Sequence, residues 1–207
     1  MAARLKLAEI ISARLCHDLA GPVGTLSATL EMVADGSADA GEALEIASAA
    51  ARALQARLCF IRAAWGASGA ELDAGAIRDH CAGLPQARKI TFAFEDLAGS
   101  FAAPMSRGLL NLTMLGIESL PRGGTVTLAG NQNDGAIMTI DGPGAAWPVN
   151  FAALLADDAA AWRALQDSRT LQAPLTALIL RQSGLKLQFL MTGDPAATAA
   201  PVLLAKA

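Results

Sequence analysis

The sequence predicts an α+β protein, with an antiparallel helical hairpin at the N-terminus and an α/β sandwich after it. Three observations predict this architecture. Apolar residues recur at steps of three and four along the first third of the chain, which is typical of amphipathic helices. The composition then turns to Gly, Ala and Ser over residues 66–69. Beyond that point, β-rich runs alternate with helical segments, which is typical of a layered domain.

The first helix is expected from about residue 3 to about residue 34. Its apolar stripe consists of Leu7, Ile11, Leu15, Leu19, Val23, Leu26, Leu30 and Val33. Pro22 has no amide hydrogen and clashes with the preceding turn, so we expect a kink one turn beyond His17. The run Asp35-Gly36-Ser37 then ends the helix.

A second helix is expected to begin at Asp39, which is a good N-cap with Glu42 three residues later. Its apolar positions are Leu44, Ala47, Ala51, Leu54, Leu58, Ile61 and Trp65. Two helices alone cannot cover their own apolar faces. We therefore expect a homodimer in which two hairpins form a four-helix bundle, with residues 1–66 as the hairpin and residues 70–207 as the second domain.

The second domain is expected to contain a sheet of about five strands. The expected helices cover residues 73–82, 104–120, 152–165 and 174–182, and the expected strands cover residues 89–95, 125–129, 136–140, 185–191 and 199–204. The turn-rich segment 131–135 ends in Asp-Gly, which favours a hairpin between two antiparallel strands.

Composition and charge exclude several classes of partner. An apolar content of 53% indicates a packed core, and a net charge of −3 gives no basic field for nucleic acid. No stretch reaches about 18 uninterrupted apolar residues, so no membrane association is expected and the protein is expected to be cytoplasmic. Cys16, Cys59 and Cys81 are odd in number and widely spaced, which predicts free thiols and no metal site.

His17 is one of only two histidines in the chain. It lies two residues from both Leu15 and Leu19, so at about 100° per residue it points away from the apolar stripe. The residues that share its face are all small: Ala13, Ala20, Gly21 and Gly24. This face leaves the imidazole accessible to a partner, although close helix–helix packing explains the two glycines equally well.

These residues carry a resemblance to a known family. The runs Cys16-His17-Asp18-Leu19, Gly21-Pro22-Val23-Gly24 and Leu30-Glu31, followed by a helical return and an α/β domain, resemble the ChpT-like histidine phosphotransferases. The resemblance covers nearly the whole chain. It implies a dimeric relay protein of bacterial phosphorelays, whose second domain resembles the ATP-binding domain of sensor histidine kinases without its nucleotide site.

The second domain departs from the kinase motifs at three places. Kinases carry two asparagines four residues apart, and here Asn111 keeps the first position while Leu115 occupies the second. The run Asp141-Gly142-Pro143-Gly144 is one residue shorter than the Asp-x-Gly-x-Gly motif. No glycine lies between residues 147 and 180, where a glycine-rich lid is expected. We infer a kinase-like fold that has lost ATP binding.

The resemblance makes His17 and Asp18 the candidate catalytic residues. A neutral imidazole nitrogen is a nucleophile, so Nε2 of His17 would attack a receiver phosphoaspartate. Asp18 would accept a hydrogen bond or the proton from Nδ1 and fix the tautomer. Mg²⁺ would come from the receiver, so the chain itself is expected to hold no metal or cofactor.

The expected partner-docking residues are Arg14, Ala13, Ala20, Gly21 and Gly24. Arg14 lies near the His17 face and is expected to attract an acidic receiver pocket. Arg52, Arg57 and Arg62 of the second helix are further candidates.

The predicted function is phosphoryl relay between the receiver domains of hybrid kinases and response regulators through His17, as a phosphocarrier and not as a kinase. Two alternatives remain open at this point. One is an active ATP-dependent histidine kinase, with Asn111, Asp141 and Gly144 in its nucleotide pocket. The other is a dimeric scaffold that binds receivers without chemistry.

Overall fold

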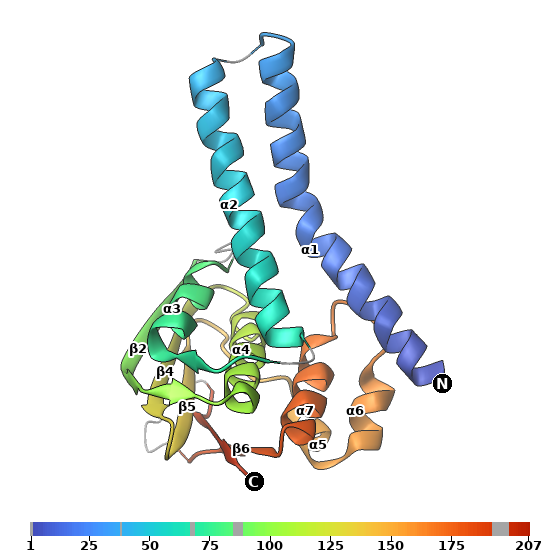
Figure 1. Cartoon of the computed structure of the whole chain (residues 1–207). Coiled ribbons are helices and arrows are strands. Elements are labelled where there is room, and N and C mark those ends of the chain that lie inside the picture. Colours follow the sequence, from blue (N-terminus) through green and yellow to red (C-terminus); the bar gives the residue numbers. More distant parts are fainter. Residues whose placement is uncertain (1, 38, 67–68, 85–88, 192–198) are drawn as a thin grey trace.

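The N-terminal third of the protein is a hairpin of two long helices. The computed structural model describes residues 2–37, 39–66, 69–84, 89–191 and 199–207. Helix α1 spans Ala2–Ala34 and helix α2 spans Ala40–Trp65. The hairpin projects from a layered domain, and the N-terminal half of α1 leans away from α2 (Figure 1). Both expected helices are confirmed.

Asp39 determines where α2 begins, and Pro22 does not interrupt α1. Asp39 caps α2, and its Oδ1 accepts hydrogen bonds from the backbone N–H groups of Gly41 and Glu42, both at 3.0 Å. The expected N-cap is therefore confirmed. Pro22 lies inside α1 and does not end it. A single long helix thus carries His17 from the layered domain up into the projecting part.

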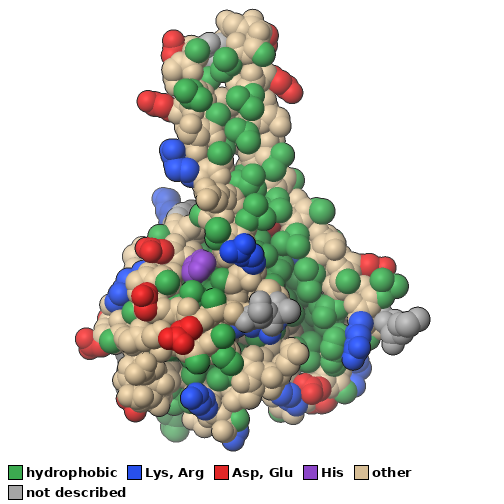
Figure 2. Space-filling view, in the orientation of Figure 1, with side chains coloured by type: hydrophobic (Ala, Val, Ile, Leu, Met, Phe, Trp, Pro, Cys, Tyr) green, Lys and Arg blue, Asp and Glu red, His purple; other side chains and the backbone are tan. Residues whose placement is uncertain are grey.

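The projecting part of the hairpin leaves much of its apolar surface uncovered. The two helices approach each other through the buried side chains of Thr29, Ala43 and Ala47. Large apolar side chains remain exposed at Val23, Leu30, Met32, Val33, Leu44, Ile46 and Leu58. Figure 2 shows apolar side chains along the face of the hairpin turned to the viewer. A single chain therefore does not satisfy the hydrophobic pattern of its own hairpin.

The second domain is an α/β sandwich. Its helices are α3 (Ala74–Ala82), α4 (Ala103–Glu118), α5 (Phe151–Ala156), α6 (Asp158–Ala164) and α7 (Gln172–Gln182). Its strands are β1 (Leu72–Asp73), β2 (Ile90–Ala98), β3 (Ser100–Phe101), β4 (Gly124–Asn131), β5 (Gly135–Asp141), β6 (Leu185–Phe189) and β7 (Val202–Lys206).

Five of these strands form one sheet, which confirms the predicted number, and their order in the sheet is β2-β4-β5-β7-β6. The pair β2–β4 is parallel, and the other neighbours are antiparallel. The hairpin predicted around residues 131–135 joins β4 to β5. The short pair β1–β3 was not predicted from the sequence. Together with the hairpin, this sheet and its helices confirm the α+β class.

Helix α4 packs closely on one face of the sheet. Buried residues Val126, Met138 and Ile140 belong to the core cluster beneath it. Glycines allow the close approach, because a Cβ added at Gly108 would lie 2.8 Å from Leu185. The same helix carries Asn111 and ends at Glu118, so its position on the sheet determines where both side chains lie.

The helical stretch expected over residues 152–165 is present, but it is divided into two helices. The structure has two short helices, α5 and α6, that meet at Asp157. Asp157 adopts an extended conformation with φ −135° and ψ 115°, and its carboxylate accepts a hydrogen bond from the N–H of Ala159 at 2.8 Å. An aspartate that caps a new helix competes with continuation of the old one.

The base of the hairpin is joined to the second domain by a buried polar cluster. The indole Nε1 of Trp65 donates to Oδ1 of Asn111 at 3.1 Å, and Nδ2 of Asn111 donates to the carbonyl of Ala64 at 2.7 Å. Gln172 donates to the Asn111 carbonyl at 3.0 Å. Part of the expected linker, residues 67–68, lies outside the described residues. The two parts are therefore separate along the sequence but packed together in space.

This cluster predicts a large effect of Asn111→Ala on stability. The substitution removes the acceptor of the partly buried indole N–H and one of the two donors to the Ala64 carbonyl, which keeps Arg107, so we expect the free energy of unfolding to fall by about 2–4 kcal/mol. Urea denaturation would measure it. Asn133→Ala, in the exposed β4–β5 turn, is the control and should change stability by less than about 0.5 kcal/mol. Equal effects of the two substitutions would contradict the role given to Asn111.

Candidate functional site

His17 stands on an open face of α1. Its side chain is 85% exposed, whereas Leu15 and Leu19 on the neighbouring face are half-buried. The expected small residues, Ala13, Ala20, Gly21 and Gly24, are all exposed beside it. A Cβ added at either glycine would meet no atom within 4 Å, so packing within this chain does not require glycine there.

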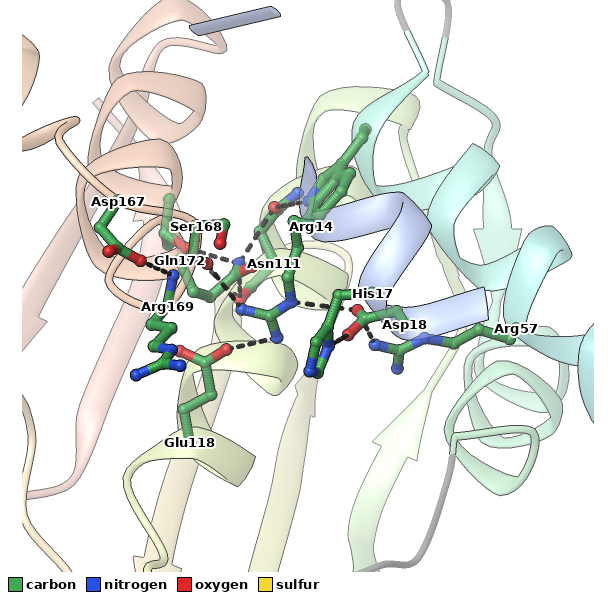
Figure 3. Close-up of polar contacts among 12 residues, drawn as sticks. Arg14, His17, Asp18, Arg57, Asn111, Glu118, Asp167, Ser168, Arg169 and Gln172 are labelled. Atoms are coloured by element: carbon green, nitrogen blue, oxygen red, sulfur yellow. Dashed lines mark hydrogen bonds and ion pairs between the residues drawn. The ribbon is translucent and has the colours of Figure 1, made fainter. Parts of the chain in front are cut away.

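The neighbouring carboxylate does reach the imidazole. Nδ1 of His17 lies 3.3 Å from Oδ1 of Asp18 (Figure 3). An ionised carboxylate only accepts hydrogen bonds, so in this arrangement Nδ1 carries the hydrogen. In the neutral ring, Nε2 then keeps its lone pair. In this arrangement, Nε2 is the nitrogen with an available lone pair on the exposed side chain.

Two arginines hold the other oxygen of this carboxylate. Oδ2 of Asp18 accepts from Nε of Arg14 at 3.0 Å and from Nη2 of Arg57 at 2.5 Å. Arg14 lies one turn earlier on α1, and Arg57 comes from α2. The side chains of Asp18 and Arg57 are each 11% exposed, which leaves the ion pair poorly screened by solvent. Asp18 thus links the two helices beneath the exposed histidine.

The arginines decide the charge of Asp18. Burial alone would raise the pKa of this carboxyl, but the hydrogen bond from Arg57 and the positive charges of Arg14 and Arg57 outweigh it and hold the pKa below its ordinary value. Burial on its own would lower the pKa of Arg14. The contacts of its guanidinium with Glu118 and Asp18 outweigh burial, so the pKa of Arg14 is raised. Asp18 is therefore a carboxylate at neutral pH.

Arg14 extends the network into the second domain. Its Nη2 donates to Oε1 of Glu118 at 2.8 Å, and its Nη1 donates to the carbonyl of Ser168 at 3.2 Å (Figure 3). Glu118 ends α4, and Ser168 lies between α6 and α7. All three guanidinium nitrogens are thus engaged within the chain. This corrects the expectation that Arg14 faces a partner's acidic pocket, since it instead supports Asp18.

Sequence reasoning missed the partners that complete this network. The i,i+4 spacing of Arg14 and Asp18 is a signal that could have identified their pairing. Glu118 is 104 residues from Arg14 along the chain, and no local pattern indicates that contact. Arg57 was considered only as a docking residue, whereas its side chain is buried against Asp18.

The candidates for a nucleotide pocket, Asn111, Asp141 and Gly144, lie in the core, at a strand end and in a turn. Asn111 is fully buried and its carboxamide binds the hairpin base. Asp141 is exposed at the end of β5, and Gly144 lies in the following turn with φ +77°. Among the residues that the structure describes, no group of three or more His, Cys, Asp and Glu side chains is placed to hold a metal ion.

The remaining reactive side chains are placed in packing or isolated positions. The three cysteines are free, and burial raises the pKa of Cys81 to about 12. Burial lowers the pKa of His80, whose ring meets the edge of Phe60 at a centroid distance of 6.2 Å.

Within the described ranges, no helix combines the length and the apolar character needed to cross a membrane.

Comparison with known proteins agrees with this architecture. Residues 74–195 match the family described as the histidine phosphotransferase C-terminal domain. The chain belongs to this family. The protein phosphotransferase ChpT of Brucella abortus (strain 2308) is 29% identical over 196 residues, which cover 92% of each chain. A solved structure described as a bacterial phosphotransferase matches with a TM-score of 0.70 and 26% identity, over 98% of this chain and 96% of the other. The resemblance found in the sequence is thus confirmed.

The lowered pKa of Asp18 predicts a pH-dependent contribution to stability. The contribution is fully present above the unfolded-state pKa of about 3.9 and is lost as pH falls through the lower folded-state pKa. At pH 7, we expect Asp18→Asn to lower the free energy of unfolding by about 1–3 kcal/mol. The difference in unfolding free energy between Asp18→Asn and the wild type should shrink between about pH 5 and pH 2.

Urea denaturation at a series of pH values would measure this gap. Asp96→Asn, at an exposed position of β2, is the control and should change stability at pH 7 by less than about 0.5 kcal/mol. A gap between wild type and Asp18→Asn that stays constant down to pH 2 would show that the carboxylate charge does not hold the network.

Proposed function

We propose that this protein is a phosphorelay carrier that accepts a phosphoryl group on His17 from one receiver domain and passes it to another without ATP. One observation carries the proposal. The imidazole is 85% exposed, and its Nδ1 faces the largely buried carboxylate of Asp18. A nucleophile that is both accessible and fixed in one tautomer suits transfer between two large protein partners.

The chemistry needs little from this chain beyond positioning. Neutral Nε2 attacks the phosphorus of a receiver phosphoaspartate, the Nε2–P bond forms, and the P–O bond to the aspartate breaks. The aspartate leaves as a carboxylate, and the proton on Nδ1 stays on the ring. The loose phosphoryl transition state needs in-line approach and charge neutralisation. The charge would be neutralised by Mg²⁺ and a lysine of the receiver.

The surface around His17 supports access by a receiver. Ala13, Ala20, Gly21 and Gly24 are exposed and small, and both glycines face open space. A receiver active site is a concave pocket at the end of a sheet, so it requires a convex partner without bulky side chains around the histidine. We propose these four residues as the docking face.

The state of Asn111 supports ATP independence. In the kinase motif this helix provides a metal-binding side chain, but here Asn111 is bonded to Trp65 and Ala64, and Leu115 is 1% exposed in the core. We therefore propose that residues 1–66 perform dimerisation and phosphotransfer, and that residues 70–207 form a degenerate ATPase-like domain. We also place the relay in the cytoplasm, where free cysteines such as these stay reduced.

The central test is phosphoryl transfer from a labelled, phosphorylated receiver to the protein. We expect acid-labile label on the wild type and on His80→Gln, and at least about a thousandfold less label on His17→Ala, because the nucleophile is removed. Gel autoradiography after rapid mixing would measure it.

Two outcomes would favour the alternatives. Label on the wild type from Mg·ATP alone would indicate an active kinase. If the protein binds a panel of phosphorylated receivers but acquires label from none of them, it would be a scaffold. Either outcome would contradict the proposed relay function.

The exposed apolar surface of the hairpin supports a dimer. Leu30 and Leu44 are 52% and 64% exposed and lie on the projecting part of α1 and α2. A second hairpin packed on this surface would complete a four-helix bundle, which is the simplest way to remove it from water. We propose that the protein is a homodimer through this surface.

Charge on this surface should separate the dimer. We expect the wild type to remain a dimer down to about micromolar protein concentration. The double substitution Leu30→Glu, Leu44→Glu should shift the protein to a monomer at the same concentration. Light scattering after gel filtration would measure the mass. Leu5→Glu, at the other end of α1 and 63% exposed, is the matched control and should remain dimeric. A wild-type mass of one chain would contradict the proposed bundle.

A further inference from the structure

We propose that Arg57 and Arg14 are positioning residues for phosphotransfer: they clamp the Asp18 carboxylate so that it accepts a hydrogen bond from Nδ1 of His17 without taking the proton. The inference rests on the proposed relay function and adds residues and a protonation state to it. It assigns to Asp18 the role of an orienting group and excludes that of a general base.

The carboxylate of Asp18 divides its contacts between its two oxygens. Both arginines donate to Oδ2 of Asp18, at 3.0 Å from Arg14 and 2.5 Å from Arg57. Oδ1 is left facing Nδ1 of His17 at 3.3 Å. Because two donors from different helices hold one oxygen, the carboxylate plane is fixed and the other oxygen points at the ring. Adjacent helical residues do not otherwise face each other.

The charged groups around His17 favour an ionised Asp18. The charged groups at the site are Asp18 and Arg14 on α1, Arg57 on α2 and Glu118 on α4, with Asp167 and Arg169 in the nearby loop (Figure 3). The two guanidinium groups favour the ionised form of Asp18, which agrees with its lowered pKa. A carboxylate stabilised in this way is a weak base. The proton therefore stays on Nδ1.

The proton on Nδ1 also affects the reactivity of the phosphorylated ring. After transfer, the imidazole has the phosphoryl group on Nε2 and a proton on Nδ1, and it carries a positive charge that the Asp18 carboxylate stabilises. When the N–P bond breaks, this ring leaves as neutral imidazole, whereas a deprotonated ring would leave as imidazolate. Retention of the proton therefore keeps the phosphohistidine reactive toward the next receiver, and equally reactive in the reverse direction.

The burial of Arg57 argues that its position has a role beyond stability. Its Nε is buried and has no hydrogen-bond partner among the described residues. A buried donor without a partner is costly, and a hydrophobic side chain would fill the space between helices more cheaply. The contact with Asp18 explains why a guanidinium suits this position.

The second domain takes part through Arg14. Glu118 and the carbonyl of Ser168 hold two of the three guanidinium nitrogens, and the third reaches Asp18. The domain that has lost the kinase motifs thus touches the histidine site through a chain of three contacts. On this account it orients the phosphoacceptor of its own chain.

The test measures the tautomer of His17 directly. In ¹⁵N-histidine-labelled protein with His80→Gln, long-range ¹H–¹⁵N NMR spectra report which ring nitrogen carries the proton. We expect the proton on Nδ1 in this background. Arg57→Gln should lower the ratio of Nδ1–H to Nε2–H by about fivefold. Arg57→Lys, which keeps the charge, should have a ratio of Nδ1–H to Nε2–H close to that of the protein with Arg57.

The control is Arg52→Gln, which makes the same charge change at an exposed position of α2 and should leave the ratio unchanged. An unchanged ratio in folded Arg57→Gln protein, or a proton on Nε2 before any substitution, would overturn the proposal. Arg14→Gln provides a second variant, with the same expected direction, if Arg57→Gln does not fold.

A transfer experiment separates this inference from the proposed function. Phospho-His17 protein is prepared with a small phosphoramidate donor, and its transfer to a receiver is followed. We expect Arg57→Gln to slow transfer about tenfold. Normal transfer by this variant would overturn the clamp and leave the relay function intact. A tautomer that responds to Arg57 in a protein that transfers to no receiver would overturn the relay function and leave only the clamp geometry.

Discussion

The carboxylate of Asp18 is the interaction on which the rest of the site depends. It meets the imidazole through one oxygen and two guanidinium groups through the other. One of these guanidiniums comes from the second helix, and the other is held by the second domain. The exposed histidine is therefore held at its Nδ1 edge, and residues of α2 and of the second domain help to orient its ring through Asp18.

The second domain is joined to the hairpin through a residue that the sequence compares with a kinase motif. Asn111 occupies the position at which kinases begin a metal-binding motif, and here its carboxamide joins α4 to Trp65 and Ala64 at the base of the hairpin. These contacts fix α4 to the base of the hairpin, and a fixed junction presents one constant surface to a binding partner.

Much of this could be predicted from the sequence because the signals are local. The exposure of His17 follows from its spacing to Leu15 and Leu19, and the start of α2 follows from Asp39. The contacts that could not be predicted join distant segments, such as Arg14 with Glu118. Side-chain periodicity determines which face a residue occupies, whereas tertiary packing determines what it meets there.

The identity of the phosphorylated nitrogen tests the account most directly. Phosphorus and ¹⁵N NMR of the protein, after it accepts phosphate from a receiver, distinguish Nε2-phosphohistidine from Nδ1-phosphohistidine. The account predicts a single product with phosphorus on Nε2 of His17 and a proton on Nδ1, because Asp18 occupies the Nδ1 side of the ring. Phosphorus on Nδ1, or on any residue other than His17, would contradict it.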